Sequence, residues 1–234
     1  MKMSKAIGII GAMKVEVDGL CALLEGSKKE EYGSRTFYVG KIKGIDVVIV
    51  ESGVGKVNAS ITTTLLCEKY DISLIINTGV AGGVGNVKPL DLVISDKLMY
   101  HDFDLSPIGY KKGELPSLGK IFETDKLYRT MAIETAENEN INYKVGNIAS
   151  GDIFATNTKI LDGLDMEISA VEMEGAAIAH ASKIFNKPFI ALRVISDVLG
   201  TKNQAISFNL VEKKAAEYAI LFVLKIIDKM VLTK

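Results

Sequence analysis

The sequence lacks tryptophan, has two histidines and two cysteines, and carries almost no net charge. Cys21 and Cys67 are far apart and do not have the spacing of a metal site or a disulfide framework, so we expect reduced thiols on apolar helix faces. The formal net charge is −1, with 28 basic and 29 acidic residues interspersed. This balance gives no electrostatic basis for binding nucleic acid or an anionic membrane.

Long hydrophobic runs and linkers are missing as well. The longest apolar stretch near the C-terminus, residues 219–224, stops at Lys225 and is too short to span a bilayer. Residues 1–5 have neither the length nor the small-residue cleavage site of a signal peptide. Because no Pro-, Gly- or Ser-rich segment divides the 234 residues, we expect a single domain over 1–234, located in the cytoplasm.

Short apolar runs alternate with amphipathic stretches along the chain. Runs typical of buried strands occupy 6–11, 35–39, 46–51, 73–77, 90–98, 143–150, 168–171 and 189–195. Helical spacing of apolar residues occupies 14–24, 58–69, 125–139 and 211–230. This alternation predicts an α/β sandwich with a largely central sheet.

Two glycine-rich segments invite a nucleotide-binding interpretation that their spacing does not support. Residues 52–56 read Ser-Gly-Val-Gly-Lys, but the phosphate-loop spacing is absent and Val57 offers no hydroxyl for a magnesium ion. Residues 78–83 read Thr-Gly-Val-Ala-Gly-Gly, which is not the dinucleotide fingerprint. We expect a tight strand-to-helix turn at the first segment. At the second we expect a turn whose amides approach a ribose or an anion.

The segment 99–120 has no regular period, and a loop of this length in a compact domain is usually functional or part of an interface. It contains His101, Asp102 and Asp104. Neither acid stands at helical i, i+4 spacing from the histidine and no second histidine is near, so we do not expect a metal site.

Acidic and aromatic side chains gather where predicted strands end. Glu16 lies in the first turn after the first strand, Glu172 and Glu174 flank a methionine at a strand-to-helix junction, and Asp197 and Phe154 each follow a strand. In α/β sheets, ligands bind in the crevice beyond the carboxyl ends of the strands. Acids in a first helical turn also offset the helix dipole, so each position alone has a structural explanation.

Arg193 interrupts an otherwise apolar strand. A buried arginine is costly unless it is paired. We expect its partner to be Glu174 or Glu16.

Several segments together resemble one known family over essentially the whole chain. They are residues 8–13, 52–57, 77–79, 81–83, 100–102, 150–152 and 171–174, with Arg193 and 195–197. The sequence resembles the 5′-methylthioadenosine/S-adenosylhomocysteine nucleosidases of the purine nucleoside phosphorylase/uridine phosphorylase superfamily. This resemblance implies a three-layer α/β/α sandwich with a central mixed sheet, and hydrolysis of an N-glycosidic bond without a cofactor or a metal.

The resemblance also implies roles for individual residues. Glu16 matches the general base that activates water, and Asp197 matches the acid at adenine N7. Glu174 matches the ligand of the ribose hydroxyls, with Met173 beside the sugar, and Phe154 matches the residue that stacks on the purine. The substrate-binding residues implied in this way are Val80, Ala81, Gly82, Phe154, Ala155, Glu172, Met173, Glu174, Arg193, Ser196 and Phe208. Ala155 would read the adenine edge through its backbone, and Phe208 would be a pocket aromatic.

In the family, the long loop lines the 5′-substituent pocket of the neighbouring subunit, which implies a homodimer with shared sites. The matching residues here are Leu105, Ile108, Tyr110 and Pro116. One departure is Val80, which stands where many nucleosidases have a serine near the nucleophilic water. We expect activity to survive this change.

Three functions remain open on the sequence. The first is hydrolysis of 5′-methylthioadenosine and S-adenosylhomocysteine, and by extension of 5′-deoxyadenosine, with water as the nucleophile. The second is a purine nucleoside phosphorylase. It would need an anion site, and beside Arg193 the candidates are Lys14 and Lys56. The third is a non-catalytic nucleoside-binding protein on the same fold.

Overall fold

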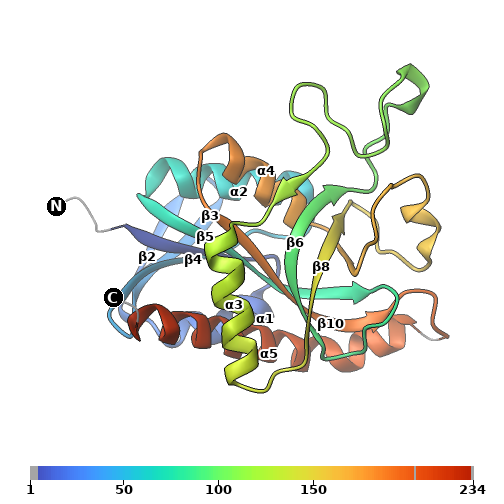
Figure 1. The fold of residues 1–234 in the computed structure, drawn as a ribbon. Coiled ribbons are helices and arrows are strands. Elements are labelled where there is room, and N and C mark those ends of the chain that lie inside the picture. The colour runs from blue at the N-terminus through green and yellow to red at the C-terminus, as the bar shows by residue number, and fades with distance from the viewer. Residues whose placement is uncertain (1–4, 203, 233–234) are drawn as a thin grey trace.

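The computed structural model describes residues 5–202 and 204–232, and within them ten strands form one mixed sheet (Figure 1). The strands are β1 (Ala6–Gly11), β2 (Glu25–Tyr32), β3 (Arg35–Ile42), β4 (Ile45–Glu51), β5 (Ile72–Gly83), β6 (Leu92–Tyr100), β7 (Phe122–Glu123), β8 (Tyr143–Ser150), β9 (Ala170–Glu172) and β10 (Phe189–Val198). Their order is β10-β6-β8-β9-β5-β1-β4-β3-β2, and β7 pairs with β6. The predicted α/β fold with a central mixed sheet is confirmed.

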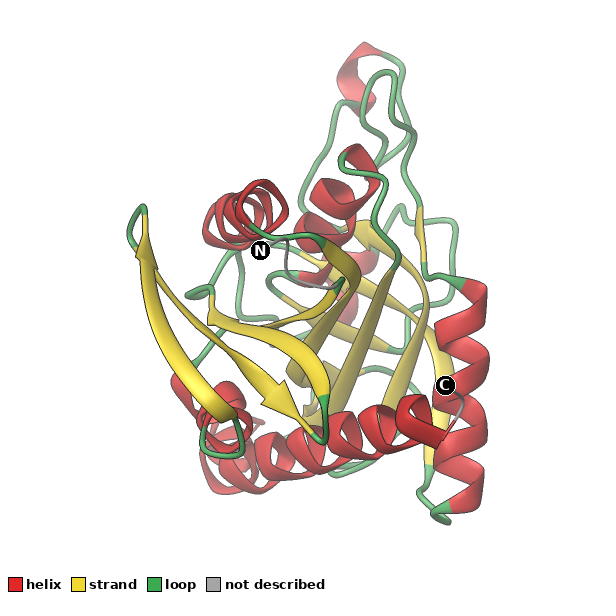
Figure 2. Ribbon diagram, turned by 90° about the vertical axis from the view of Figure 1, so that its left-hand side faces the viewer, coloured by secondary structure: helices red, strands yellow, loops and turns green. Residues whose placement is uncertain are grey.

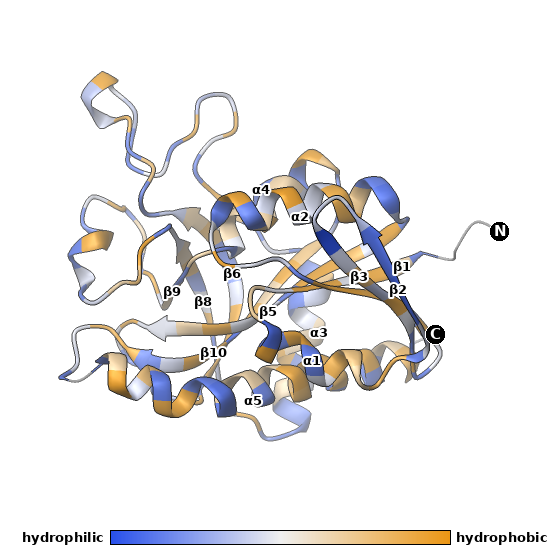
Figure 3. Ribbon diagram, turned by 180° about the vertical axis from the view of Figure 1, so that it is seen from behind, coloured by the Kyte–Doolittle hydropathy of each residue, from blue (hydrophilic) through white to orange (hydrophobic). Residues whose placement is uncertain are grey.

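Helices cover both faces of this sheet (Figures 1 and 3). They are α1 (Lys14–Cys21), α2 (Lys56–Lys69), α3 (Lys126–Asn138), α4 (Gly175–Ile184) and α5 (Gln204–Leu232), with short 3₁₀ turns η1 (Ser106–Ile108) and η2 (Thr158–Leu161). Helices α2 and α4 pack together on one face, while α5 packs with α1 and α3 on the other. Each face buries its own apolar core, the first including Phe37 and Leu66 and the second Leu20 and Phe222.

Part of the sheet closes on itself. Strand β10 pairs antiparallel with β6 and parallel with β5, so β10, β6, β8, β9 and β5 form a ring (Figure 2). In this ring Arg193 lies opposite Gly79, and Gly82 lies between Asp197 and Val171. The ring therefore brings side chains from β5, β9 and β10 toward one point.

The prediction of a turn at residues 78–83 was wrong. These residues continue β5, because they pair with β10 along their length and with β9 at Gly82 and Gly83. Strand β10 likewise runs to Val198, three residues beyond its predicted end, so Asp197 lies inside it after a bulge. Helix α5 begins at Gln204, seven residues before the predicted start.

Strand β2 was not predicted at all. Its sequence, Glu-Gly-Ser-Lys-Lys-Glu-Glu-Tyr, has no apolar alternation, and nearly all of it is exposed (Figure 3). It exists because it pairs with β3 at the end of the sheet, where charged residues are normal for an edge strand.

The cysteine prediction is consistent with the structure, in which Cys21 and Cys67 are free and partly buried. Burial raises the pKa of both thiols to about 11. Residues 1–4, where no signal peptide is expected, lie outside the described part of the chain. Among the helices of the described residues, none has the length and apolar content to cross a membrane.

Candidate active site

One cavity of about 240 Å³ opens where β5, β9 and β10 end. Both predicted catalytic residues, Glu16 and Asp197, line it, and so do all eleven predicted substrate-binding residues. Six lining residues were not predicted: Ala12, Met13, Val54, Ile153, Val171 and Gln204. The structure thus brings together residues that are up to about 190 positions apart in the chain, while their roles remain predictions.

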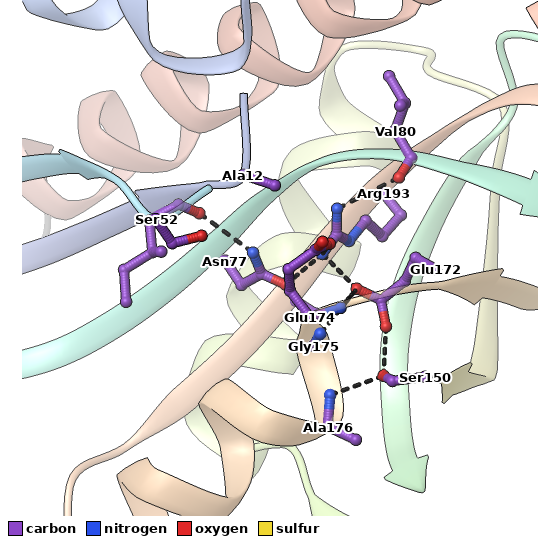
Figure 4. A network of polar contacts seen from close by, with 12 residues as sticks. Ala12, Ser52, Asn77, Val80, Ser150, Glu172, Glu174, Gly175, Ala176 and Arg193 are labelled. Atoms are coloured by element: carbon purple, nitrogen blue, oxygen red, sulfur yellow. Dashed lines mark hydrogen bonds and ion pairs between the residues drawn. The ribbon is translucent and has the colours of Figure 1, made fainter. Parts of the chain in front are cut away.

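A buried ion-pair network forms part of the cavity lining (Figure 4). Arg193, only 1 % exposed, pairs with Glu172 and lies 3.6 Å from the Glu174 carboxylate. Its guanidinium also donates to Asn77 Oδ1 at 2.7 Å and to the Val80 carbonyl at 3.2 Å. Glu172 is therefore the nearer ion-pair partner of Arg193, and the expected partner Glu174 lies farther away.

The carboxylate of Glu172 is hydrogen-bonded to other groups of the protein. Besides Arg193, it accepts hydrogen bonds from the Ser150 hydroxyl and from the amides of Glu174 (3.0 Å) and Gly175 (2.7 Å). Ser150 in turn accepts from the Ala176 amide at 2.7 Å. Although Glu172 lines the cavity, these four bonds fix Arg193 and the first turn of α4 rather than leaving oxygens free for a ligand.

Glu16 is buried, at 1 % exposure, near the start of α1. One carboxylate oxygen accepts from the amides of Ala12 (2.7 Å) and Met13 (3.0 Å), and the other accepts from the Val80 amide at 3.0 Å. Burial raises the pKa of Glu16 above its usual value, while the positive charge of Arg193 and the three amides oppose that rise. The result is a rigidly held carboxylate with raised basicity.

Val80 serves this arrangement through its main chain. Its amide holds Glu16 and its carbonyl accepts from Arg193, so neither contact needs a hydroxyl side chain. The preceding Gly79 is required for steric reasons, because a Cβ at that position would overlap both Glu16 and Arg193.

Glu174 lies beside this pair. The Gly55 amide donates to its Oε1 at 2.9 Å. Burial and then the negative charge of Glu172 raise the pKa of Glu174 to about 7, against the lowering effect of Arg193. Its Oε2 faces Arg193 at 3.6 Å, beyond hydrogen-bond distance, so this oxygen can still accept from a ligand hydroxyl.

Asp197 and two aromatic residues give another part of the cavity lining the character of a site for a flat polar group. Asp197 Oδ1 accepts from the Ser196 hydroxyl at 2.6 Å, and Oδ2 accepts from Gln204 Nε2 at 2.7 Å. Phe154 and Phe208 pack edge to face with ring centroids 5.5 Å apart. Sequence reasoning missed Gln204, because it lay in a segment read as a connection before the last helix.

The candidate cations for a phosphate site lie elsewhere. Lys14 is on the surface and pairs with Asp18, and Lys56 pairs with Asp102 at 2.6 Å and lies 3.8 Å from Asp152. Neither lines the cavity. Among the described residues, no group of three or more His, Cys, Asp or Glu side chains has the arrangement of a metal site.

The four predicted 5′-pocket residues do not reach this cavity. They lie on the long loop that includes η1, drawn in green, which projects away from the body in Figure 1. Ile108 is 70 % exposed, Tyr110 and Pro116 are exposed, and Leu105 is partly exposed. Within one chain, therefore, this loop contributes nothing to the cavity lining.

Comparison with known proteins identifies the family of the chain. A family model described as the phosphorylase superfamily matches residues 6–228. The 5′-methylthioadenosine/S-adenosylhomocysteine nucleosidase of Haemophilus influenzae is 40% identical over 228 residues, covering 96% of this chain and 99% of the relative. The nucleosidase of the same name from Bacillus subtilis is 36% identical over 229 residues, with the same coverage.

Solved structures are similar over the whole fold. The Neisseria meningitidis nucleosidase in complex with methylthio-immucillin-A superimposes with a TM-score of 0.91 and 33% identity, covering 97% of this chain and 100% of that one. Futalosine hydrolase of Helicobacter pylori gives a TM-score of 0.90 and 30% identity, covering 96% and 98%. The chain therefore belongs to the phosphorylase superfamily and, within it, to the family of 5′-methylthioadenosine/S-adenosylhomocysteine nucleosidases.

Proposed function

We propose that this protein hydrolyses the N-glycosidic bond of 5′-methylthioadenosine and S-adenosylhomocysteine, releasing adenine and the 5-substituted ribose. The observation that carries the proposal is that two acids line one cavity at different places, Glu16 held by the Val80 amide and Asp197 held by Gln204, together with the aromatic pair Phe154 and Phe208. The proposal extends to 5′-deoxyadenosine, because it shares the adenosine part with these two substrates.

Breaking this bond develops positive charge on the ribose and negative charge on the leaving base. Glu16 is held by three amides at the place where a base for water is needed, and its raised pKa strengthens it as a proton acceptor. Glu174 accepts from the ribose hydroxyls and stabilises the cationic sugar. Asp197 donates a proton to the base at N7 while Phe154 and Phe208 contact its ring and the Ala155 backbone reads its edge.

Water is the nucleophile favoured by the charges. A phosphorylase must hold a phosphate dianion, usually with arginines. Arg193 is already paired with Glu172 and close to Glu174, while Lys14 and Lys56 are paired with acids outside the cavity. A dianion placed near Glu16 would meet three carboxylates against one guanidinium, which is unfavourable by like-charge repulsion.

We also propose that the protein acts as a homodimer in the cytoplasm. The cavity is bordered by Val54, which is 46 % exposed, and from there Val57 and Ile61 continue an exposed apolar row along α2, at 69 % and 48 %. A row of this kind is typical of a protein–protein contact. Docking of a second copy here would place its long loop near the open side of the cavity. Free, partly buried thiols agree with a reducing compartment.

The test is release of adenine from 5′-methylthioadenosine, with and without phosphate, and with identification of the sugar. We expect free methylthioribose in phosphate-free buffer. Glu16→Gln should lower turnover by about 10²–10⁴-fold, the usual contribution of a general base, while adenine binding is kept. Release that requires phosphate and yields the sugar 1-phosphate would contradict the proposal. Equal turnover by Glu16→Gln would remove Glu16 from its role.

A further inference from the structure

Gln204 is a buried polar residue of the cavity that has no role in the reaction outlined above. It is the first residue of α5 and is 6 % exposed. Its side-chain Nε2 lies 2.7 Å from the Ala155 carbonyl oxygen and 2.7 Å from Asp197 Oδ2. Its Oε1 accepts from the Gly200 amide at 3.2 Å. One carboxamide NH₂ group therefore satisfies two acceptors at once.

These two acceptors are the groups that the proposed function assigns to the edge of the base. The 6-amino group of an aminopurine also carries two N–H hydrogens on one nitrogen, and it would donate them to the same carbonyl and the same carboxylate. Gln204, Ala155 and Asp197 all line the same cavity, so a base that binds there competes with the Gln204 NH₂ group for both acceptors.

We propose that Gln204 takes the place of the 6-amino group in the free protein, and that an aminopurine binds by displacing it. The inference rests on the proposed function. Without Gln204, the Ala155 carbonyl oxygen and Asp197 Oδ2 would lose this donor, and Asp197 would keep only the Ser196 hydroxyl on Oδ1. Buried acceptors without a donor are costly. With Gln204 in place, each hydrogen bond that the base gains replaces one that the protein gives up. Gln204 therefore weakens binding of the base and sets how much the 6-amino group contributes.

The experiment compares two free bases by isothermal titration calorimetry, adenine and unsubstituted purine, which lacks the amino group. In Gln204→Leu, adenine should bind about five- to tenfold more tightly than in the wild type, the equivalent of one or more net hydrogen bonds. Purine displaces nothing, so its affinity should not change. The ratio of the adenine affinity to the purine affinity should therefore rise. A less ordered site would weaken the binding of both bases and would not raise this ratio.

Two further variants make the result specific. Gln204→Met keeps an unbranched side chain but has no NH₂ donor, so it should also bind adenine more tightly. Asn209→Leu, an exposed amide on the same helix, should behave as the wild type. Thermal melting of each variant shows that the fold is kept.

Unchanged or weaker adenine binding in both Gln204 variants would overturn the inference, as would an equal gain for purine. These outcomes differ from failure of the proposed function, which would appear as a wild type that neither binds adenine nor releases it from 5′-methylthioadenosine.

Discussion

At the scale of single residues, Glu174 illustrates how neighbours set the charge of a functional group. Its pKa is raised to about 7 by burial and by Glu172, so its carboxyl is partly protonated at neutral pH. Only the ionised form has both oxygens available as acceptors and carries the negative charge that stabilises a cationic sugar.

We therefore expect kcat/KM for 5′-methylthioadenosine to fall as the pH drops below about 7, and to reach a plateau above it. Since the folded pKa is raised, the active ionised form is lost earlier on acidification than for an ordinary glutamate. Glu174→Gln should lower kcat/KM and remove the part of this limb that comes from Glu174, leaving the loss caused by protonation of Glu16, whose pKa is raised as well. Glu217→Gln, an exposed glutamate on α5, should leave the profile intact. A wild-type profile that is flat between about pH 5 and 8 would contradict the assignment.

The residues that sequence analysis located were those with a positional signal. Glu16 and Glu174 follow short apolar strands, and Asp197 lies close to the end of a longer one, so the edge of the sheet predicted their proximity. Gln204 had no such signal. A single sequence does not indicate that a glutamine in a segment read as a loop directs its side chain into a cavity. The close partner of Arg193 was missed for a similar reason, since the choice between Glu172 and Glu174 depends on side-chain direction.

At the scale of elements, β5 carries a strict geometric requirement at the cavity. Gly79 lies where Glu16 from α1 and Arg193 from β10 both approach the strand. Gly79→Ala should lower the free energy of unfolding by about 1–3 kcal/mol, the usual cost of overpacking. It should also lower kcat/KM by about 100-fold, because Glu16 and Arg193 must shift.

Denaturant unfolding and steady-state kinetics on the same preparation check this prediction. Gly85→Ala is the matched control, since Gly85 has open space around its Cβ position and only a positive φ of 71°. It should cost about 1 kcal/mol and leave the kinetics unchanged. Equal kinetic losses in both variants would mean that backbone strain, not overlap with Glu16 and Arg193, is responsible.

The alternation of strands and helices could be predicted because it depends on the local spacing of apolar residues. The extension of β5 through residue 83 could not, since three glycines and an alanine within residues 78–83 suggest a turn until the long-range pairing with β10 and β9 is known. Strand β2 is stabilised by its neighbour β3 and has no apolar face of its own, so its sequence resembles a solvated loop.

At the scale of the whole molecule, the exposed apolar row on α2 and the projecting loop lie on the same side of the body, the upper side in Figure 1. Val57→Glu should break the proposed dimer, because it places a charge in an apolar contact. We expect a change from dimer to monomer in sedimentation velocity. We also expect a raised KM for 5′-methylthioadenosine, since the cavity then loses the loop of the second copy.

Leu127→Glu on α3 is the control. Leu127 is 65 % exposed, close to the value for Val57, but α3 packs on the other face of the sheet. It should change neither mass nor KM. A wild type that sediments as a monomer at micromolar concentration would refute the shared site.

The three carboxylates around Arg193 also have a consequence for calorimetry. A carboxyl that titrates near pH 7 makes binding of a charged ligand a proton-exchange reaction. An analogue with a cationic ring in place of the ribose should lower that pKa and expel up to about half a proton into the buffer at pH 7. The observed enthalpy would then depend on the ionisation enthalpy of the buffer, whereas binding of a neutral nucleoside analogue at the same pH should show little such dependence.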